Sequence, residues 1–262
     1  MMTRNKELSK YLDPLGLSAW RFYPEVESTN DIALEWAKQG APDGSLVVAD
    51  AQTAGRGRAG RHWVTEPGGS LAFSLVLRPS PAEAEYFPRF TALAALGLIN
   101  ALSRLGLRAT LKWPNDVLLT GCKVAGVLVE ADWQADKLKT VVIGVGVNIS
   151  PKSVPQPGIL RYPATAVESV LGSGVDRWAL LSEILRGMRN YRAVLVDDAF
   201  IDAWNNHLAW RDAWVRFRLP GEKAQVMKVL GVQSDGRLVL EDRAGQQMKA
   251  LTGEILMTAD KH

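Results

Sequence analysis

Cysteine is nearly missing from this chain, since its 262 residues include only one, Cys122. A single cysteine cannot form an intrachain disulfide, and such scarcity is typical of proteins that live in a reducing compartment. Long apolar runs are missing too, so the sequence predicts no membrane span. The first ten residues are polar and lack the apolar core of a secretion signal. We therefore expect a cytoplasmic protein.

A strong excess of one charge is also missing. The chain has 31 Lys and Arg against 28 Asp and Glu, a net charge of +3 and a pI of about 9.0. These charges are spread along the sequence, so the mildly basic balance is weak evidence for a nucleic-acid partner. Hydrophobic residues make up 47% and charged residues 23%, which is ordinary for a globular protein. The length allows one large domain, or a large and a small one.

What the sequence does have is a short segment rich in glycine and arginine. Residues 55–63 read Gly-Arg-Gly-Arg-Ala-Gly-Arg-His-Trp and lie between strand-like segments at 45–49 and 70–77. Glycine permits close backbone approach, arginine matches carboxylate or phosphate, and tryptophan offers a face for a base. Flanking strands argue against a disordered nucleic-acid-binding arm. The pattern predicts a mobile loop that folds over an anionic, nucleotide-containing small molecule.

The character of the chain changes at about residue 213, which predicts two domains, residues 1–212 and 213–262. Helices are expected from a cap at Ser28 or Thr29 to about Gln39, at 85–105 and within 164–207. Strands are expected at 45–50, 70–78, 109–113 and 139–149, with a hairpin at 117–130 and a proline-rich loop at 151–163. After residue 213, short strands separated by turns predict a small closed barrel.

Polar clusters at strand ends and loops are the candidates for chemistry. They comprise Ser28-Thr29-Asn30, Gln52, the loop 55–63, the segment 112–116 (Lys-Trp-Pro-Asn-Asp), Lys123 and Asn148. A lysine, an asparagine and an aspartate around a proline turn can bind phosphate and metal. Each cluster alone also has a plain structural interpretation: a helix cap, a surface ion pair, a hairpin lysine that faces water, or an amide that satisfies backbone at a strand end.

Taken together and in this order, the clusters are highly specific. Ser-Thr-Asn, Gly-Arg-Gly-Arg-x-Gly-Arg-x-Trp, Lys-Trp-Pro-Asn-Asp, Lys-x-x-Gly-x-Leu-x-Glu and Gly-x-Gly-x-Asn follow one another from about Glu27 to Ile149. This series resembles biotin protein ligase, the enzyme that attaches biotin to carboxylase carrier domains. The resemblance implies an α+β fold: a mixed catalytic sheet with flanking helices, related to the class II aminoacyl-tRNA synthetase core, followed by a small SH3-like C-terminal β-barrel.

The resemblance implies two half-reactions. The biotin carboxylate attacks the α-phosphorus of MgATP, giving biotinyl-5′-AMP and pyrophosphate, and a lysine amine of a biotin carboxyl carrier protein then displaces AMP. Attack of a carboxylate on a polyanion requires charge neutralisation, which the cationic clusters can supply. A glycine-hinged loop can hide the reactive intermediate from water. The expected partners are biotin, ATP with Mg²⁺ and the carrier protein, and a homodimer through the catalytic sheet is allowed.

The resemblance also implies roles for individual residues. Those implied to bind biotin are Ser28, Thr29, Asn30, Gln52, Arg56, Gly57, Arg58, Lys123 and Gly126. Those implied to bind ATP are Arg58, Arg61, Trp63, Lys112, Asn115 and Asn148, with Trp63 covering adenine. Those implied to act in catalysis are Lys123, Arg58, Asp116 and Lys112. Asp116 either orients Lys123 or accepts a proton from the incoming lysine, and no dedicated metal ligands are expected.

Two other functions compete with this one. A lipoate or octanoate protein ligase belongs to the same superfamily, but the polar Ser-Thr-Asn and Gln52 suit a ureido ring better than a dithiolane. A nucleic-acid-binding regulator would use the arginine loop and the barrel, and its binding would depend steeply on salt. An inactive scaffold is disfavoured because every motif keeps its charged residues. Only about 26 residues precede the Ser-Thr-Asn motif, so we expect no DNA-binding repressor domain.

Overall fold

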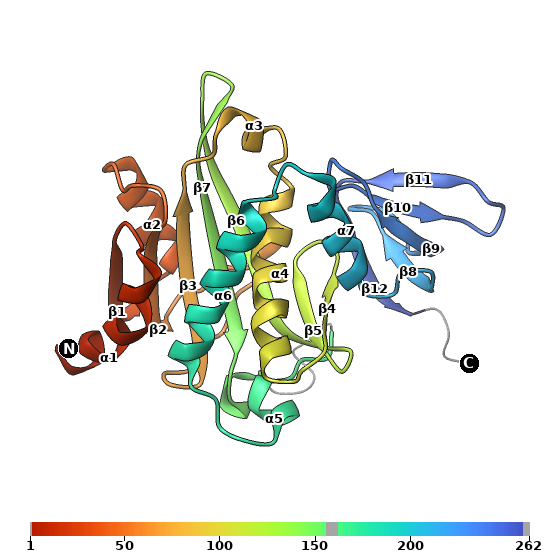
Figure 1. The fold of residues 1–262 in the computed structure, drawn as a ribbon. Helices are drawn as coiled ribbons and strands as arrows, with labels where there is room; N and C mark the ends of the chain where they lie inside the picture. The colour runs from red at the N-terminus through yellow and green to blue at the C-terminus, as the bar shows by residue number, and fades with distance from the viewer. Residues whose placement is uncertain (1, 156–161, 259–262) are drawn as a thin grey trace.

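The computed structural model describes residues 2–155 and 162–258, and it contains two sheets with a layer of helices (Figure 1). The strands of the larger sheet are β1 (Trp20–Val26), β2 (Ser45–Gln52), β3 (Ser70–Leu77), β4 (Ala109–Lys112), β5 (Asp116–Leu119), β6 (Cys122–Gln134) and β7 (Lys137–Asn148). The helices are α1 (Met2–Leu12), α2 (Thr29–Lys38), α3 (Pro81–Ala84), α4 (Arg89–Arg104), α5 (Val167–Leu171), α6 (Arg177–Arg192) and α7 (Asp198–His207). The predicted α+β class is confirmed.

The larger sheet has the order β1-β2-β3-β7-β6-β5-β4. Strands β1 and β2 are parallel and are joined through α2, whereas all other neighbours run antiparallel. The crossover through α2 is what parallel pairing requires, because parallel neighbours cannot be joined by a tight turn. It places the N-terminus of α2 over the middle of the sheet.

The two faces of this sheet differ sharply in side-chain size. On β7, Val141, Ile143, Val145 and Val147 belong to the main hydrophobic core beneath α4 and α6. The residues between them face the other side of the sheet, and two of these, Gly144 and Gly146, have no side chain. Because successive side chains of a strand point to opposite faces, the motif Gly-x-Gly-x-Asn encodes an apolar face and a bare face. α2 covers part of the bare side, packing Ala33 and Ala37 on valines of β2, β3 and β7.

Helices α4 and α6 lie side by side over the core face (Figure 1). They approach each other at Gly97 and Gly187, where a Cβ on Gly97 would lie 2.9 Å from the backbone nitrogen of Met188. Small residues at a crossing let two helix backbones come close. α4 is shorter than the predicted helix at 85–105: it begins at Arg89, after Pro88 and the separate turn of α3. Proline restricts the residue before it and favours a helix start, which explains this correction.

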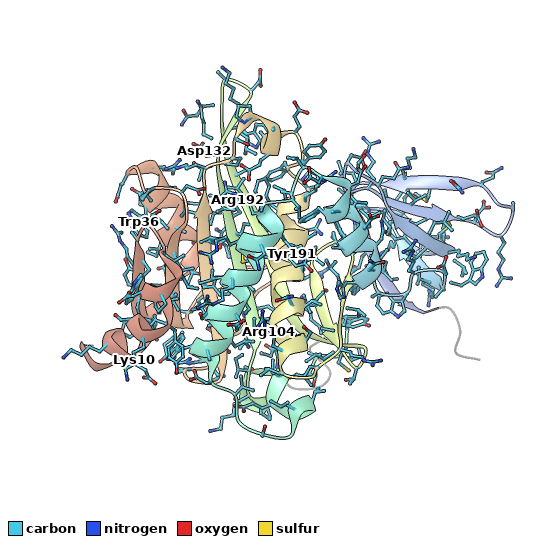
Figure 2. All side chains as sticks on the ribbon, viewed as in Figure 1. Lys10, Trp36, Arg104, Asp132, Tyr191 and Arg192 are labelled. Carbon is cyan, nitrogen blue, oxygen red and sulfur yellow. The ribbon has the colours of Figure 1, made fainter. Side chains whose placement is uncertain are left out.

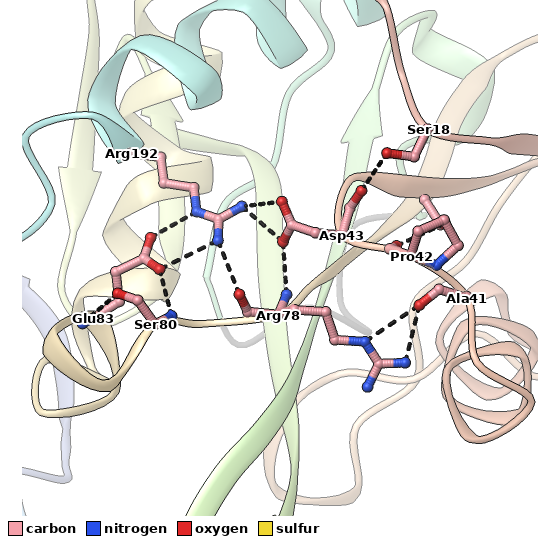
Figure 3. Close-up of polar contacts among 9 residues, drawn as sticks. Ser18, Ala41, Pro42, Asp43, Arg78, Ser80, Glu83 and Arg192 are labelled. Atoms are coloured by element: carbon pink, nitrogen blue, oxygen red, sulfur yellow. Dashed lines mark hydrogen bonds and ion pairs between the residues drawn. The ribbon is translucent and has the colours of Figure 1, made fainter.

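A polar network fastens the C-terminal end of α6 to the sheet (Figure 3). Arg192 donates to both oxygens of Asp43, at 2.9 and 2.8 Å, and to Glu83 at 2.7 Å. Glu83 also completes a capping box with Ser80 at the start of α3. Burial alone would raise the pKa of Glu83, but the hydrogen bonds from Arg192 and Ser80 keep that pKa below its ordinary value. The network joins the last turn of α6 to the turn before β2, to the end of β3 and to α3.

The smaller sheet has the order β11-β10-β9-β8-β12 and is antiparallel throughout. Its strands are β8 (Trp214–Arg218), β9 (Gln225–Val232), β10 (Leu238–Glu241), β11 (Gln247–Ala250) and β12 (Glu254–Thr258). It stands beside the larger sheet at the end where β4 and β5 lie (Figure 1). The division of the chain at residues 212 and 213 stays a prediction. Among the described residues, no helix is long and apolar enough to cross a membrane.

The predicted loop at 151–163 includes a short 3-10 turn, Pro151–Ser153, and part of it, with Pro157, lies outside the described residues.

Candidate functional site

A single row of cross-strand partners forms the floor of the site on the bare face of the larger sheet. From β4 to β2 the paired residues are Lys112, Asp116, Gly126, Gly146, Ala72 and Ala49. The charged members lie at one end and the small members at the other. Directly opposed residues of neighbouring strands lie within contact distance. The register therefore turns motifs that are far apart in sequence into one surface with a charged end and a flat end of glycine and alanine.

The charged end is a carboxylate between two ammonium groups. Lys123 Nζ lies 2.6 Å from Asp116 Oδ1, and Lys112 Nζ lies 3.8 Å from Asp116 Oδ2. Asp116 and Lys112 are buried, and Lys123 is half-buried. Burial lowers the pKa of Lys112, and the charge of Asp116 opposes that effect. The three groups carry a net positive charge, which favours a nearby anion.

Tyr162 closes this end from outside the sheet. The Lys112 ammonium lies 4.0 Å from the centre of the Tyr162 ring, a cation–π geometry. The Tyr162 hydroxyl donates to the carbonyl of Gly121 at 2.9 Å. Burial raises the pKa of Tyr162 to about 12, so its hydroxyl keeps its proton at neutral pH.

The N-terminus of α2 supplies the polar groups over the flat end. The hydroxyl of Thr29 donates to Gln52 Oε1 at 3.0 Å, and the Thr29 backbone N–H donates to the same oxygen at 2.8 Å. Ser74 donates to Asn30 Oδ1 at 2.6 Å. Asn30 stands directly above Gly144, where a Cβ would collide with its amide. Ser28 is buried at the N-cap position, but its side chain makes no capping hydrogen bond, so capping does not account for it.

The glycine–arginine loop folds as a small hairpin over this surface. Arg56 and His62 pair across it, and the Gly57 N–H donates to the Arg61 carbonyl at 2.7 Å. Arg58–Gly60 form the turn, in which Gly60 has φ of 70°. Glycine adopts this left-handed conformation without steric cost. The loop therefore presents its arginines from a defined backbone.

Trp63, at the end of the loop, lies against the glycine floor. A Cβ on Gly126 would meet its ring at 3.3 Å, and one on Gly146 would collide with it. Its indole Nε1 is buried without a hydrogen-bond partner among the described residues. The Lys123 ammonium lies 5.6 Å from the ring centre. The predicted contact with adenine stays a prediction, and the structure shows that Trp63 borders the predicted biotin residue Gly126 as well.

The three arginines of the loop have different surroundings. Arg58 points to Asn115, at 3.4 Å from its Oδ1, and burial lowers its pKa. Arg61 donates to Glu254 of β12 at 3.0 Å. Arg56 is already held by two carboxylates: it makes two bonds to Glu130, at 3.0 and 2.8 Å, and one to Asp31 at 2.5 Å.

The remaining predicted residues support the backbone around the floor. Asn115 donates to the Val127 carbonyl of β6 at 2.9 Å, and Asn148 donates to the Thr165 carbonyl at 3.1 Å. The segment 112–116 also reaches the smaller sheet, because Trp113 Nε1 donates to the Gly236 carbonyl at 3.2 Å. A cleft of about 690 Å³ opens between the two sheets, lined by the arginine loop, by 127–130 of β6, and by Gly236 and Leu251.

Several residues around the site have no role in the sequence-based assignment. Glu130 stands in the motif Lys-x-x-Gly-x-Leu-x-Glu, and that position is the signal that could have found it. Tyr162 and Glu254 follow no motif and meet the site only through tertiary structure. No group of three or more His, Cys, Asp or Glu in the described chain is arranged to hold a metal ion.

Comparison with known proteins decides between the candidate families. Residues 22–148 match the model of the biotin/lipoate A/B protein ligase family. The biotin–[acetyl-CoA-carboxylase] ligase of Paracoccus denitrificans is 34% identical over 236 residues, which cover 85% of this chain and 94% of that protein. The chain belongs to the biotin protein ligase family.

Two further relatives agree with this membership. The bifunctional ligase/repressor BirA of Bacillus spizizenii is 33% identical over 225 residues, covering 84% of this chain and 68% of that protein. The solved structure of the Aquifex aeolicus biotin protein ligase in complex with biotin and ATP is 27% identical, with a TM-score of 0.76. That superposition covers 91% of this chain and 97% of the Aquifex chain. Membership of this family confirms the resemblance drawn from the motifs.

Proposed function

We propose that this biotin protein ligase family member activates biotin with MgATP as biotinyl-5′-AMP and transfers biotin to a lysine of a biotin carboxyl carrier protein. One observation carries the assignment of the chemistry to this site. Two lysines converge on Asp116 at the end of a glycine floor, and an arginine loop lies above that floor. The floor already carries one flat ring, the indole of Trp63, and the cations at its end would neutralise a carboxylate and a phosphate.

The first half-reaction joins two anions. A carboxylate oxygen of biotin bonds to the α-phosphorus of ATP while the bond to pyrophosphate breaks, and negative charge grows on the bridging and leaving oxygens. Lys123 and Lys112 are held in place before the reaction, so their charges stabilise the transition state without reorganisation. Arg58, half-buried beside Asn115, is suited to bind the phosphate.

Biotin would lie on the glycine floor with its ureido ring toward α2. Thr29, Asn30 and Gln52 are already linked in a hydrogen-bonded group there, and a ureido ring offers both donors and an acceptor. Gly126 and Gly146 carry no side chains and the indole of Trp63 rests on them, so a bound ring would stack on that indole or take its place. Asn115 would bind the nucleotide, with Asn148 near it, and both donate to backbone carbonyls that hold them in place.

The second half-reaction attacks the mixed anhydride. The ε-amine of the acceptor lysine bonds to the biotin carbonyl carbon, the bond to the AMP oxygen breaks and AMP leaves, and the proton of the amine passes to water or to Asp116. Asp116 bridges both lysines, and its short ion pair with Lys123 supports a role in orienting that side chain. The cleft beside the loop supports a path for the acceptor lysine. Cytoplasmic location, a homodimer and the lack of DNA binding stay predictions.

Pyrophosphate exchange tests the proposed function. Labelled pyrophosphate should enter ATP only when the protein is supplied with biotin, and lipoate or octanoate should not replace biotin. Exchange with octanoate but not biotin would assign the protein to the other branch of the superfamily. Exchange with neither acid would refute adenylation at this site.

A further inference from the structure

Glu130 connects two parts of the site that the motifs treat as separate. Its carboxylate accepts two parallel hydrogen bonds from Arg56, at the base of the arginine loop. The same carboxylate accepts a hydrogen bond of 2.7 Å from Asn30 Nδ2, at the N-terminus of α2. Asn30 is buried and Glu130 is half-buried. A bidentate arginine–carboxylate pair fixes the relative orientation of the two side chains as well as the distance between them.

The contact with Asn30 extends further into the pocket. Asn30 Oδ1 accepts from Ser74, whose hydroxyl oxygen lies 2.8 Å from the Thr29 hydroxyl oxygen, and the Thr29 backbone N–H donates to Gln52. A continuous series of polar contacts thus runs from Gln52 to Arg56. Chains of this kind place every member relative to the next, because an unpaired buried polar group is costly.

We propose that Glu130 is a positioning residue that locks the base of the arginine loop to the biotin pocket. Arg56 is then an anchor for the loop, because its guanidinium is occupied by Glu130 and Asp31. The part of the loop that moves over the substrate is reduced to residues 57–62. The assignment of a pocket for biotin rests on the proposed function, whereas the anchoring of the loop does not.

Limited trypsin digestion tests the anchor directly, because trypsin cleaves after Arg58 and Arg61. Glu130→Gln removes the charge and one acceptor oxygen, and should speed cleavage of the loop in the free protein about fivefold, as expected for loss of one partly exposed, two-pronged ion pair. Asp132→Asn is the matched control, since Asp132 lies two residues further along β6 (Figure 2). Among the described residues, its carboxylate accepts a side-chain hydrogen bond only from Gln134. The control should cleave like the wild type.

A second variant separates the anchor from general loss of stability. Arg56→Lys keeps the charge and the cleavage site but cannot make two parallel bonds. Its loop should cleave as fast as that of Glu130→Gln, and the double variant should add little, which is the signature of residues acting as a pair. Melting temperatures are measured alongside. Cleavage in Glu130→Gln that matches the control, or effects that simply add in the double variant, would overturn the proposal.

Kinetics tests the link to the pocket. In biotin-dependent pyrophosphate exchange, Glu130→Gln should raise KM for biotin about fivefold and change kcat less than about twofold, because Lys112 and Lys123 are untouched. An unchanged KM would show that the anchor does not reach the pocket. If the wild type shows no exchange with biotin, the proposed function fails while the trypsin experiment still decides the anchor.

Discussion

Asp116 illustrates how one carboxylate can organise a cationic site. Two free lysines close together would repel each other, and burial of Lys112 adds a further penalty that lowers its pKa. The carboxylate between them offsets that penalty and fixes both ammonium groups. The three groups therefore keep a net charge of one unit in a defined place, ready for a developing anion.

Lys123 provides the sharpest test of the chemistry. Lys123→Ala should fold normally, because the side chain is half-buried at the start of β6 and Lys112 still faces Asp116 in the variant. Loss of a preorganised charge should slow formation of biotinyl-5′-AMP by ~10²–10³. Stopped-flow adenylation measures this rate. Transfer from chemically supplied biotinyl-5′-AMP should be affected less, and near wild-type adenylation would move the catalytic role toward Lys112.

Arg58 is expected to act in retention of the intermediate. Arg58→Ala should remove a charge-assisted contact worth ~1.5–3 kcal/mol, so that biotinyl-5′-AMP escapes into solution and labels proteins indiscriminately. The release rate can be followed with radiolabelled intermediate. Arg108→Ala, at an exposed position outside the site, is the control. Equal release from the two variants would mean that this loop is not a lid.

At the scale of the elements, the sequence predicts the strands of the site better than it predicts the contacts between them. The alternation of valine with glycine at 144–147 already indicates a strand with one bare face, and the turn at 120–121 indicates the hairpin of β5 and β6. Register, however, depends on bulges such as the one between Val117 and Leu118. Strand register therefore could not be predicted from the sequence. The cross-strand row that brings Lys112, Asp116 and Gly146 together depends on that register, so it could not be predicted either.

Contacts made by residues outside the sequence motifs could not be predicted, for a different reason. Glu254 meets Arg61 across 193 positions of sequence, and Tyr162 meets Lys112 through a loop without regular periodicity. No local pattern encodes such pairs, because they arise when whole elements pack. The motif residues can be predicted from the sequence because the chemistry requires those residue types. Partners that only orient the motif residues cannot be predicted in this way.

The close contact between β7 and Trp63 predicts that a larger residue at Gly146 destabilises the protein. Gly146→Ala places a Cβ where the indole of Trp63 now lies. Either Trp63 leaves the floor or the sheet deforms, and overpacking of this kind costs about 1–3 kcal/mol. Urea unfolding measures the loss, and tryptophan fluorescence reports movement of the indole. Gly174→Ala, where a Cβ would meet only Glu168 at 3.9 Å, is the control and should be nearly neutral.

At the scale of the whole molecule, the smaller sheet is part of the site's wall. Trp113 bonds to Gly236 and contacts Phe217 with ring centres 6.3 Å apart, so the Lys-Trp-Pro-Asn-Asp segment is seated on that sheet. Glu254 bridges Arg61 of the loop and Arg218 of β8, each at 3.0 Å. Displacement of the smaller sheet would therefore disturb both the loop and the lysine end of the floor.

Glu254 makes this connection sensitive to pH. Burial would raise its pKa, but the charges of Arg61 and Lys112 and a hydrogen bond from Arg218 lower it below the ordinary value of 4.5. A carboxyl that binds protons less tightly when folded stabilises the protein above its unfolded pKa, and that contribution is lost as pH falls through the folded pKa. The melting temperature of the wild type should exceed that of Glu254→Gln at pH 7, and the two should converge at acidic pH. A constant difference down to pH 3 would contradict this linkage.

The bare face has a consequence for how the protein and its substrate depend on each other. A floor of glycines leaves a part of the interior without side chains, and in the free protein the indole of Trp63 is what rests on it. A ring bound there fills the place that side chains fill elsewhere in the hydrophobic core, but it binds reversibly from solution. Since such a ligand binds only the folded chain, its concentration sets part of the folding equilibrium. The vitamin supply of the cell would then also govern how long each copy of the enzyme survives proteolysis.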